Sequence, residues 1–266
     1  EYSIRIINKI KNLNFDIIEL HNRPIMVKEF FQKINSKIIL YFHNDPTTMK
    51  GAKSIDERIY LLKHVDKIIF ISKWVKKRFF KNLPVLSDNK TQIIYHSIDP
   101  IKKNSKKNKQ IIFVGKLNVS KGYDLYCKSM FKVLDLHKDW KAYSIGEEKR
   151  FQNYSTHRRH VNLGQISHTK VLDFLSKSAI AIIPSRWEEP FGRTSLEASS
   201  RGCATIISNT GGLIETTDYA VILKKLDVRN IELETIKLIR NDKLRKKIQE
   251  KSKKFVKHKL KINSKV

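Results

Sequence analysis

The sequence has few cysteines, no long apolar run and no initiating methionine. Its two cysteines, Cys127 and Cys203, stand far apart in no metal-like spacing, which argues against a disulfide framework or zinc site and favours a reducing cytoplasm. No run of about 18 or more apolar residues occurs, so no membrane-spanning helix is predicted. No secretory signal precedes the first helical pattern. Because the chain opens at Glu1 inside that pattern, it is interpreted as a fragment or a trimmed form.

Two familiar binding motifs are also missing. A dinucleotide-binding Rossmann fingerprint needs Gly-x-Gly-x-x-Gly after a first strand, and the segment from Gly115 to Ser120 lacks the later glycines. An NAD-dependent enzyme is therefore set aside. No Asp-x-Asp motif is present, which fits a protein that does not depend on a metal ion.

Acidic residues are scarce relative to basic ones. The 54 Lys and Arg against 26 Asp and Glu give a formal net charge of +28. Such an excess is typical of a polyanionic partner, namely nucleic acid, an anionic membrane or a phosphorylated substrate. A composition biased by an AT-rich genome explains the excess equally well, and both explanations stay open. A nucleic-acid-binding protein is the alternative function, but the lysines are dispersed and no recognisable module is present.

Short apolar runs alternate with amphipathic ones in the first part of the chain. The apolar runs predict strands over 15–20, 38–42, 67–71 and 92–95. Helical spacing lies between them over 25–35, 55–64 and 73–81. Residues 102–109 are charged and lack an apolar anchor, which is typical of a linker.

The alternation restarts after this linker. Strands are predicted over 110–115, 140–145, 160–163, 180–184, 205–208 and 220–223, and helices over 123–136, 169–177, 193–201 and from 231 onward. Regular alternation implies a mostly parallel sheet with helices on both faces. The predicted fold class is therefore α/β, with two Rossmann-like domains facing each other. Their predicted bounds are 1–104 and 105–250, followed by a basic helix or tail over 251–266.

A tight turn and a helix follow predicted strand 180–184. Ligands of open parallel sheets bind beyond the carboxyl ends of the strands. Pro190 and Gly192 favour the turn, and the helix N-terminus after it offers backbone N–H groups to an anion. Glu189 before the turn and Glu197 in the second helical turn supply carboxylates that accept hydrogen bonds from vicinal hydroxyls. The combination predicts a ligand with sugar, phosphate and ribose, although each Glu taken alone is more typical of a solvated surface.

A second anion-binding feature follows predicted strand 110–115. Gly115 allows backbone to approach a ligand, and Lys116 and Lys121 stand five residues apart on the loop. Two lysines at the carboxyl end of a buried strand can neutralise a diphosphate. Either lysine alone is more simply a solvated surface residue in a chain so rich in lysine.

These residues together resemble a known family, the group-1 (family 4) glycosyltransferases. The resemblance covers roughly residues 110–250 and rests on motifs that occur in the family's order: Phe113-Val114-Gly115-Lys116-Leu117, Lys121-Gly122, Gly146, Leu163-Gly164, Ile183-Pro184-Ser185, Glu189-Pro190-Phe191-Gly192, Leu196-Glu197-Ala198, Gly202, Gly211-Gly212 and Glu215. It implies the GT-B fold and transfer with retention of anomeric configuration.

The resemblance also implies roles for individual residues. Glu189 is expected to hold the hydroxyls of the donor sugar, and Glu197 the ribose. Lys121, and Lys116 where the family commonly has Arg, are expected to neutralise the diphosphate. The other donor-binding positions implied by the resemblance are Gly115, the backbone N–H groups of Phe191, Gly192, Arg193 and Thr194, and a base-contacting segment with Gly164 and Ile166.

The first part of the chain resembles the family's acceptor domain less specifically. His43, after predicted strand 38–42, resembles a histidine that faces the donor sugar, and a structural role is an equal alternative. His21 follows a strand in the same way and is interpreted as structural, with the acceptor cleft as the alternative. The family's amino-terminal glycine-rich loop has no counterpart here, so the acceptor domain is expected to be incomplete. A nucleotide-sugar-binding fragment without activity therefore remains a further alternative.

The function implied by the resemblance is transfer of a sugar from a UDP- or GDP-type nucleotide sugar to a glycolipid or polysaccharide acceptor. Neither a metal nor a cofactor is expected to take part, and no nucleic-acid partner is expected. The basic charge adds an anionic membrane surface as a partner. The predicted location is the cytoplasm, with peripheral attachment to the inner membrane face.

Overall fold

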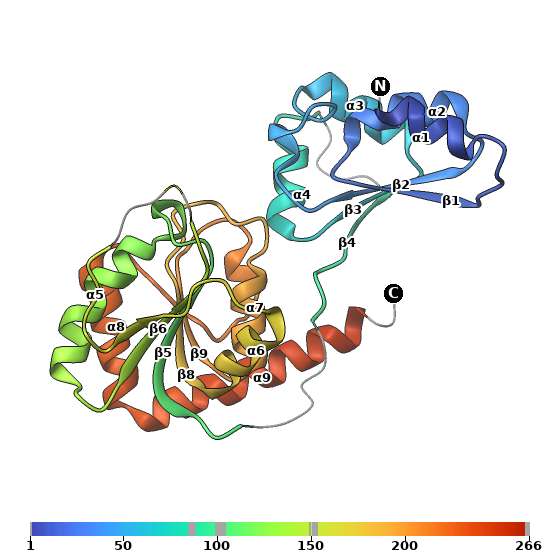
Figure 1. The fold of residues 1–266 in the computed structure, drawn as a ribbon. Coiled ribbons are helices and arrows are strands. Elements are labelled where there is room, and N and C mark those ends of the chain that lie inside the picture. The colour runs from blue at the N-terminus through green and yellow to red at the C-terminus, as the bar shows by residue number, and fades with distance from the viewer. Residues whose placement is uncertain (1, 85–88, 99–104, 149, 151–153, 264–266) are drawn as a thin grey trace. The chain divides into compact units, whose positions relative to one another are not determined.

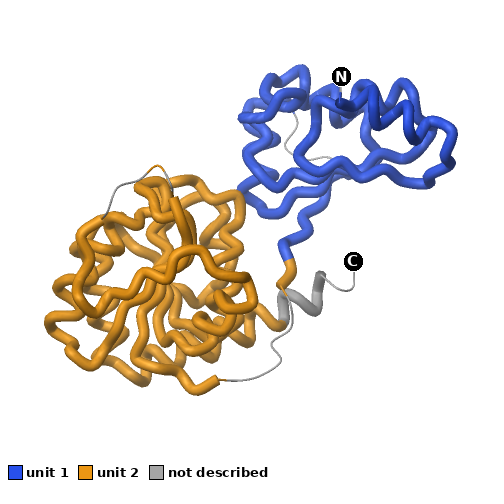
Figure 2. The backbone as a smooth tube through the Cα atoms, in the orientation of Figure 1, with its two compact units in different colours: residues 1–96 blue, residues 97–266 orange. Residues whose placement is uncertain are grey.

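The computed structural model describes residues 2–84, 89–98, 105–148, 150 and 154–263, with side chains described as far as residue 257. The chain divides into two compact units, residues 1–96 and 97–266, which Figure 2 shows in different colours. The domain boundary predicted after residue 104 falls at the end of 99–104, which are outside the described residues.

Unit 1 is built on a parallel sheet in the order β1-β2-β3-β4. Its strands are β1 (Ile17–His21), β2 (Lys37–Phe42), β3 (Lys67–Phe70) and β4 (Thr91–Ile93). Its helices are α1 (Tyr2–Ile10), α2 (Val27–Lys33), α3 (Ile55–His64) and α4 (Lys73–Phe80). Local signals explain where these helices begin: Ser54 and Glu57 form a capping box at α3, and the Ser72 side chain caps α4.

Unit 2 is built on a parallel sheet in the order β10-β9-β8-β5-β6-β7. Its strands are β5 (Asn108–Val114), β6 (Lys141–Ile145), β7 (His160–Asn162), β8 (Ser178–Ile183), β9 (Ala204–Ile207) and β10 (Val221–Ile222). Its helices are α5 (Tyr123–Leu136), α6 (His168–Lys177), α7 (Arg193–Ser200), α8 (Val228–Arg240) and α9 (Asp242–Asn263).

Two hydrophobic cores cover the two faces of the unit 2 sheet. In β5, Ile111 and Phe113 belong to the core shared with α5 and α8, whereas Ile112 belongs to the core shared with α6 and α7. This division follows from the alternation of side chains along a strand. Because both faces are covered, the central strands are continuous apolar runs, and every residue of β8 is buried. Figure 1 shows α5 and α8 together, apart from α6 and α7.

The predicted α/β class with two parallel Rossmann-like sheets is confirmed. Most element bounds agree with prediction within two residues, and the helix predicted over 55–64 is reproduced as α3. The helix predicted over 25–35 is split, because Pro24 opens a 3-10 turn (Pro24–Met26) ahead of α2. The basic segment expected from residue 251 is the second half of α9, which begins at Asp242 and packs against α7 and β9.

Candidate functional site

The strand order of unit 2 creates a place for a ligand. β5 comes first along the chain but lies inside the sheet, with β6 on one side and β8 on the other. The sheet therefore grows outward from β5 in two directions. The loops that leave the carboxyl ends of β5 and β8 diverge at such a topological switch point, and open α/β sheets bind ligands there. The predicted anion-binding residues lie on the loops after β5 and β8.

The loop after β5 is shaped by its own hydrogen bonds. The Asn118 side chain accepts a hydrogen bond from the backbone N–H of Lys121 at 3.0 Å and so begins a 3-10 turn (Val119–Lys121). Gly122 then has φ of +71°, and a Cβ there would lie 1.9 Å from the carbonyl oxygen of Pro184. Only glycine allows this approach. Lys116, on the same loop, is exposed.

The loop after β8 is joined to the loop after β5 through backbone. The carbonyl oxygen of Ser120 accepts hydrogen bonds from the N–H groups of Arg186 and Trp187 at 2.9 and 3.1 Å. The Arg186 guanidinium also binds both carboxylate oxygens of Asp124 at 2.6 and 2.8 Å. Burial alone raises the pKa of Asp124, but the hydrogen bonds from Arg186 outweigh it and leave that pKa below its ordinary value. The two loops are therefore joined into one wall.

Lys121 and Glu189 meet on this wall. The Lys121 Nζ lies 2.6 Å from Glu189 Oε1, and the two side chains are 24% and 12% exposed. The same Nζ lies 4.4 Å from the centre of the Trp187 ring, a cation–π distance. The structure thus brings together the carboxylate predicted to hold the sugar and a lysine predicted to neutralise the diphosphate.

The backbone of Glu189 is held from its other side by the two glycines after β9. The N–H of Gly212 donates to the carbonyl oxygen of Glu189 at 2.6 Å. A Cβ on Gly211 would lie 2.3 Å from that same oxygen. The paired glycines therefore let a distant loop pack directly against the predicted sugar-binding residue.

The helix α7 begins at the turn that the sequence predicts. Gly192 is its N-cap with φ of +96°, and no side chain caps the helix. The N–H groups at such a start have no partner within the helix, so they are available to an anion. Phe191 is buried at 2% exposure and anchors the turn, whereas Arg193 is exposed and Thr194 half-buried.

Glu197 is buried on α7 at 6% exposure, yet it is not isolated. Its Oε1 accepts hydrogen bonds from Arg193 Nε at 2.9 Å and from His168 Nε2 at 3.0 Å. His168 stands at the first position of α6. The prediction assigned Arg193 only a backbone role, and in the structure its side chain also binds the predicted ribose carboxylate. His168 was not predicted.

Three glycines end the adjacent strands β5, β6 and β7. Gly115, Gly146 and Gly164 all have positive φ, and the N–H of Gly146 donates to the carbonyl oxygen of Gly164 at 2.9 Å. A Cβ on Gly146 would lie 1.9 Å from the carbonyl oxygen of Gly115, whereas one on Gly164 would meet open space. Ile166 is half-buried and packs against the α6 side of the core. Of these positions only Gly164 has open space beside it, at the edge where the base is predicted to bind.

In unit 1, His43 lies just beyond the carboxyl end of β2. Its Nε2 lies 2.8 Å from Nδ1 of His21, and its Nδ1 lies 3.1 Å from Nε2 of His96. Burial, and then the neighbouring His21, lower the pKa of His43. Both ring nitrogens of His43 are therefore hydrogen-bonded within unit 1. The predicted contact of His43 with the donor sugar stays a prediction.

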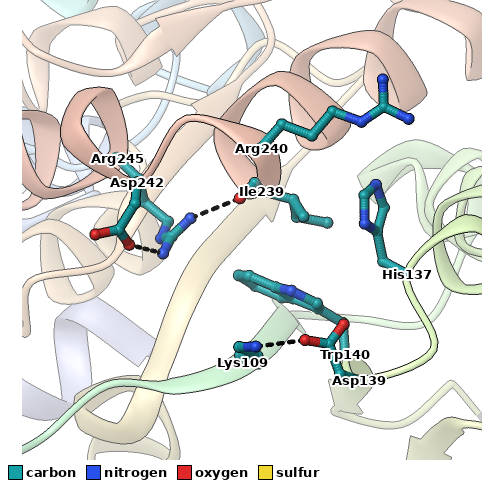
Figure 3. Close-up of a pocket in the computed structure, with 8 residues that line it drawn as sticks. All are labelled: Lys109, His137, Asp139, Trp140, Ile239, Arg240, Asp242 and Arg245. Atoms are coloured by element: carbon teal, nitrogen blue, oxygen red, sulfur yellow. Dashed lines mark hydrogen bonds and ion pairs between the residues drawn. The ribbon is translucent and has the colours of Figure 1, made fainter.

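A pocket of about 360 Å³ lies at the opposite, amino edge of the unit 2 sheet (Figure 3). Lys109 forms an ion pair with Asp139 there, and Arg245 forms one with Asp242. The Cζ of Arg245 also lies 5.3 Å from the centre of the Trp140 ring. The Lys109–Asp139 pair joins β5 to the segment before β6, and the contact of Arg245 with Trp140 joins that segment to α9. The complete lining is Lys109, His137, Asp139, Trp140, Ile239, Arg240, Asp242 and Arg245. None of these is a predicted site residue.

Two further features of the described residues bear on the sequence predictions. Within the described ranges, no three His, Cys, Asp or Glu side chains are arranged to hold a metal ion. Among the helices that the structure describes, none is both long and apolar enough to cross a bilayer.

The sequence reasoning missed the side chains that hold the site residues in place. They are Trp187 beside Lys121, His168 beside Glu197, and the Arg186–Asp124 pair that joins the two loops. A weak signal existed for Trp187, since an aromatic residue directly before two glutamates on a predicted ligand loop is unusual. His168 carried no local signal, because its partner is 29 residues away along the chain.

The comparisons with known proteins agree with this geometry. Residues 96–255 match the family model described as glycosyl transferases group 1, which is more than half of the chain. The matched stretch includes both loops of the switch point and helix α7. The chain belongs to the group 1 glycosyl transferases.

Two curated relatives of this group 1 glycosyl transferase come from bacteria. A 42.6 kDa protein in the cps region of Klebsiella pneumoniae is 29% identical over 206 residues, which cover 73% of the chain and 52% of that protein. Spore coat protein SA of Bacillus subtilis is 22% identical over 237 residues, which cover 77% of the chain and 62% of that protein. The chain therefore spans less than two thirds of the length of these relatives.

Solved structures show the same fold at low sequence identity. Anabaena HepE, solved in complex with UDP and glucose, superimposes with a TM-score of 0.78 at 13% identity over 99% of this chain and 79% of that one. The sucrose-phosphate synthase of Thermosynechococcus elongatus superimposes with a TM-score of 0.76 at 13% identity. The match covers 97% of this chain and 73% of that one. The chain thus shares the fold of these two solved structures.

Proposed function

We propose that this group 1 glycosyl transferase moves a sugar from a nucleoside-diphosphate sugar of the UDP or GDP type to a glycolipid or polysaccharide acceptor. The proposal includes retention of anomeric configuration and no requirement for a metal ion. The observation that supports it most strongly is the Lys121–Glu189 pair at the switch point of unit 2. One carboxylate suits sugar hydroxyls, and the cation beside it suits a phosphate.

The proposed donor site divides among the residues around that pair. Glu189 and the N–H groups of Phe191 and Gly192 bind the sugar, and Glu197 binds the ribose. Lys121 faces the diphosphate. The other proposed donor contacts are Lys116 and Gly115, the N–H groups of Arg193 and Thr194 at the start of α7, the base-contacting Gly164 and Ile166, and His43 at the sugar.

The proposed reaction breaks the bond between the sugar C1 and the phosphate oxygen, whose electron pair stays with the departing nucleoside diphosphate. The acceptor oxygen bonds to C1 from the same face, and its proton passes to an oxygen of the departing diphosphate. Negative charge develops on the leaving diphosphate, where lysines and a helix N-terminus can stabilise it without a metal. Retention is part of the proposal because the family resemblance implies it, and a same-face attack needs no carboxylate nucleophile.

The donor site predicts a loss of nucleotide-sugar affinity in Glu197→Gln. The substitution keeps the size of the side chain but removes the negative charge of the carboxylate. Glu197 is only 6% exposed, so water does not replace the hydrogen bonds that this carboxylate accepts. A hydrogen bond to a charged group contributes about 1.5–3 kcal/mol, so affinity for UDP-glucose is expected to fall by about 10–100-fold. Isothermal titration calorimetry measures this directly.

The matched control is Glu188→Gln, which makes the same chemical change in an exposed residue of the loop after β8. Its affinity is expected to equal that of the wild type. Equal affinities for wild type and Glu197→Gln mean that the assignment of the ribose site is wrong. A parallel thermal-shift comparison of UDP-, GDP-, ADP- and CMP-sugars identifies the preferred nucleotide.

Membrane association is proposed from the net charge of +28. Each basic residue near an anionic lipid surface contributes roughly 1 kcal/mol of attraction. The chain is expected to sediment with phosphatidylglycerol vesicles at physiological salt and to stay in the supernatant with phosphatidylcholine vesicles. Failure to bind the anionic vesicles leaves the charge as a compositional feature, and peripheral attachment to the inner membrane face is then wrong.

A further inference from the structure

Glu197 lies where two helices of unit 2 meet. It belongs to α7, and His168, the first residue of the neighbouring α6, reaches it from the side. Glu197 Oε1 lies 2.9 Å from Arg193 Nε and 3.0 Å from His168 Nε2. The Arg193 contact is local to α7, whereas the His168 contact spans 29 residues of the chain. His168 is therefore the side chain through which α6 holds this carboxylate.

Both contacts fall on the same carboxylate oxygen of Glu197. An ionised carboxylate only accepts hydrogen bonds, so the His168 ring must donate through Nε2–H. A carboxylate has about four lone-pair sites on its two oxygens, and two donors occupy those of Oε1. Within the part of the chain that the structure describes, no side chain or backbone group donates to Oε2. Oε2 therefore keeps its lone pairs for a ligand.

The burial of Glu197 explains why the orientation of its carboxylate matters. Glu197 is buried, whereas the side chains of His168 and Arg193 are 52% and 61% exposed. At a buried carboxylate water competes less for the free oxygen, so a ligand hydroxyl gains more by donating to it. Two partners that fix the carboxylate in advance also lower the entropy cost of binding.

His168 also stands at the end of the loop that follows β7. At the start of this loop the N–H of Gly164 donates to Asn162 Oδ1 at 3.0 Å. The carbonyl oxygen of Gly164 accepts the N–H of Gly146 at 2.9 Å. The loop is thus hydrogen-bonded beside β6 and β7 at one end and joined to α7 through His168 at the other. The proposed base-contacting loop and the proposed ribose carboxylate are therefore linked by one side chain.

We infer that His168 is a positioning residue that makes the donor site selective for nucleotides with both ribose hydroxyls. The inference rests on the proposed function, in which Glu197 binds the ribose. His168 and Arg193 hold Oε1, and Oε2 accepts hydrogen bonds from the two vicinal hydroxyls, one for each lone pair. His168 acts through the carboxylate and does not contact the nucleotide itself.

Calorimetry that compares UDP with 2′,3′-dideoxy-UDP tests the inference, with GDP and its dideoxy form measured in parallel. The wild type is expected to bind the ribonucleotide about 10–100-fold more tightly, because the dideoxy form leaves a buried charged acceptor unpaired. His168→Phe keeps an aromatic ring but has no N–H to donate. It is expected to reduce this preference by about 3–10-fold, through weaker ribonucleotide binding at unchanged affinity for the dideoxy form.

Three further variants control for effects on packing. His168→Ala removes the donor together with the ring and is expected to reduce the preference as His168→Phe does. His168→Gln carries an amide N–H that can replace Nε2–H, and it is expected to keep most of the preference. His137→Phe makes the same ring substitution elsewhere in unit 2, at a half-buried histidine whose Nε2 has no hydrogen-bond partner among the described residues. It is expected to keep the wild-type preference.

A double variant distinguishes positioning from direct contact. In a Glu197→Ala background the carboxylate is absent, so adding His168→Phe is expected to leave the remaining preference unchanged. A further loss of preference in that background means that His168 binds the nucleotide itself, and the positioning role is then wrong.

The outcomes for the wild type and for His168→Phe separate this inference from the proposed function. If the wild type binds UDP-glucose but does not prefer UDP or GDP over the dideoxy forms, the inference is wrong and the proposed function stands. The same holds if His168→Phe keeps the preference or lowers both affinities equally. If the wild type binds neither UDP-glucose nor any of these nucleotides, the proposed function is wrong, and the role of His168 in ribose recognition falls with it.

Discussion

Lys121→Ala is expected to lower the rate of UDP release from UDP-glucose by about 10²–10³-fold, the usual effect of removing one donor that stabilises developing charge. The Lys121 side chain is only 24% exposed, and its Nζ lies 2.6 Å from Glu189 Oε1. Its loss leaves the leaving diphosphate without this cation and leaves a largely buried carboxylate unpaired. Both effects act on the same step, which makes this the largest catalytic effect expected from a single side chain.

Two variants control for the loss of a positive charge in general. Lys128→Ala removes an exposed lysine of α5 and is expected to keep the wild-type rate. Lys121→Arg keeps the charge with a different shape and is expected to retain an intermediate rate. If Lys121→Ala and Lys128→Ala release UDP equally fast, Lys121 does not stabilise the leaving group.

Gly122→Ala is expected to cause the largest loss of stability. Its left-handed conformation costs an L-residue about 1–2 kcal/mol, and the new Cβ would lie 1.9 Å from the Pro184 carbonyl oxygen. Relief of that overlap costs about a further 1–3 kcal/mol. Urea unfolding followed by tryptophan fluorescence in a Trp74→Phe background reports on unit 2 alone, because Trp140 and Trp187 then remain.

Gly164→Ala is the matched comparison. Gly164 has a similar φ of +63°, but a Cβ there would meet no atom within 4 Å. Gly164→Ala is expected to lower the free energy of unfolding by about 1–2 kcal/mol, which is the cost of the left-handed conformation alone. Equal losses at the two positions mean that the contact between Gly122 and Pro184 does not constrain the loop.

Much of the fold was predictable because its signals are local. A strand buried on both faces must be apolar throughout, and the run over 180–184 therefore predicted β8. Glycines after strands marked the sharp turns at Gly115, Gly146 and Gly192, whose positive φ the structure shows. Pro24 splits the helix predicted over 25–35 through an equally local effect, because it opens a 3-10 turn ahead of α2.

The partners of the site residues were not predictable in the same way. Lys121 and Glu189 are 68 residues apart, and Glu197 and His168 are 29 apart. They meet because β8 pairs with β5 and α6 packs beside α7, and no pattern along the chain specifies which strand will be a neighbour. For the same reason His43 was interpreted as a single residue, whereas the structure places it between His21 and His96.

The sequence by itself determined the alternation of strands and helices, the positions of the turns and the identity of the residues at the ends of β5 and β8. These depend on side-chain periodicity and on backbone freedom, which act over a few residues. Only the tertiary structure decided that Glu189 is paired, that Glu197 is bound by two donors, and that three histidines form a row. Such pairings depend on strand order, which the packing of the whole unit selects.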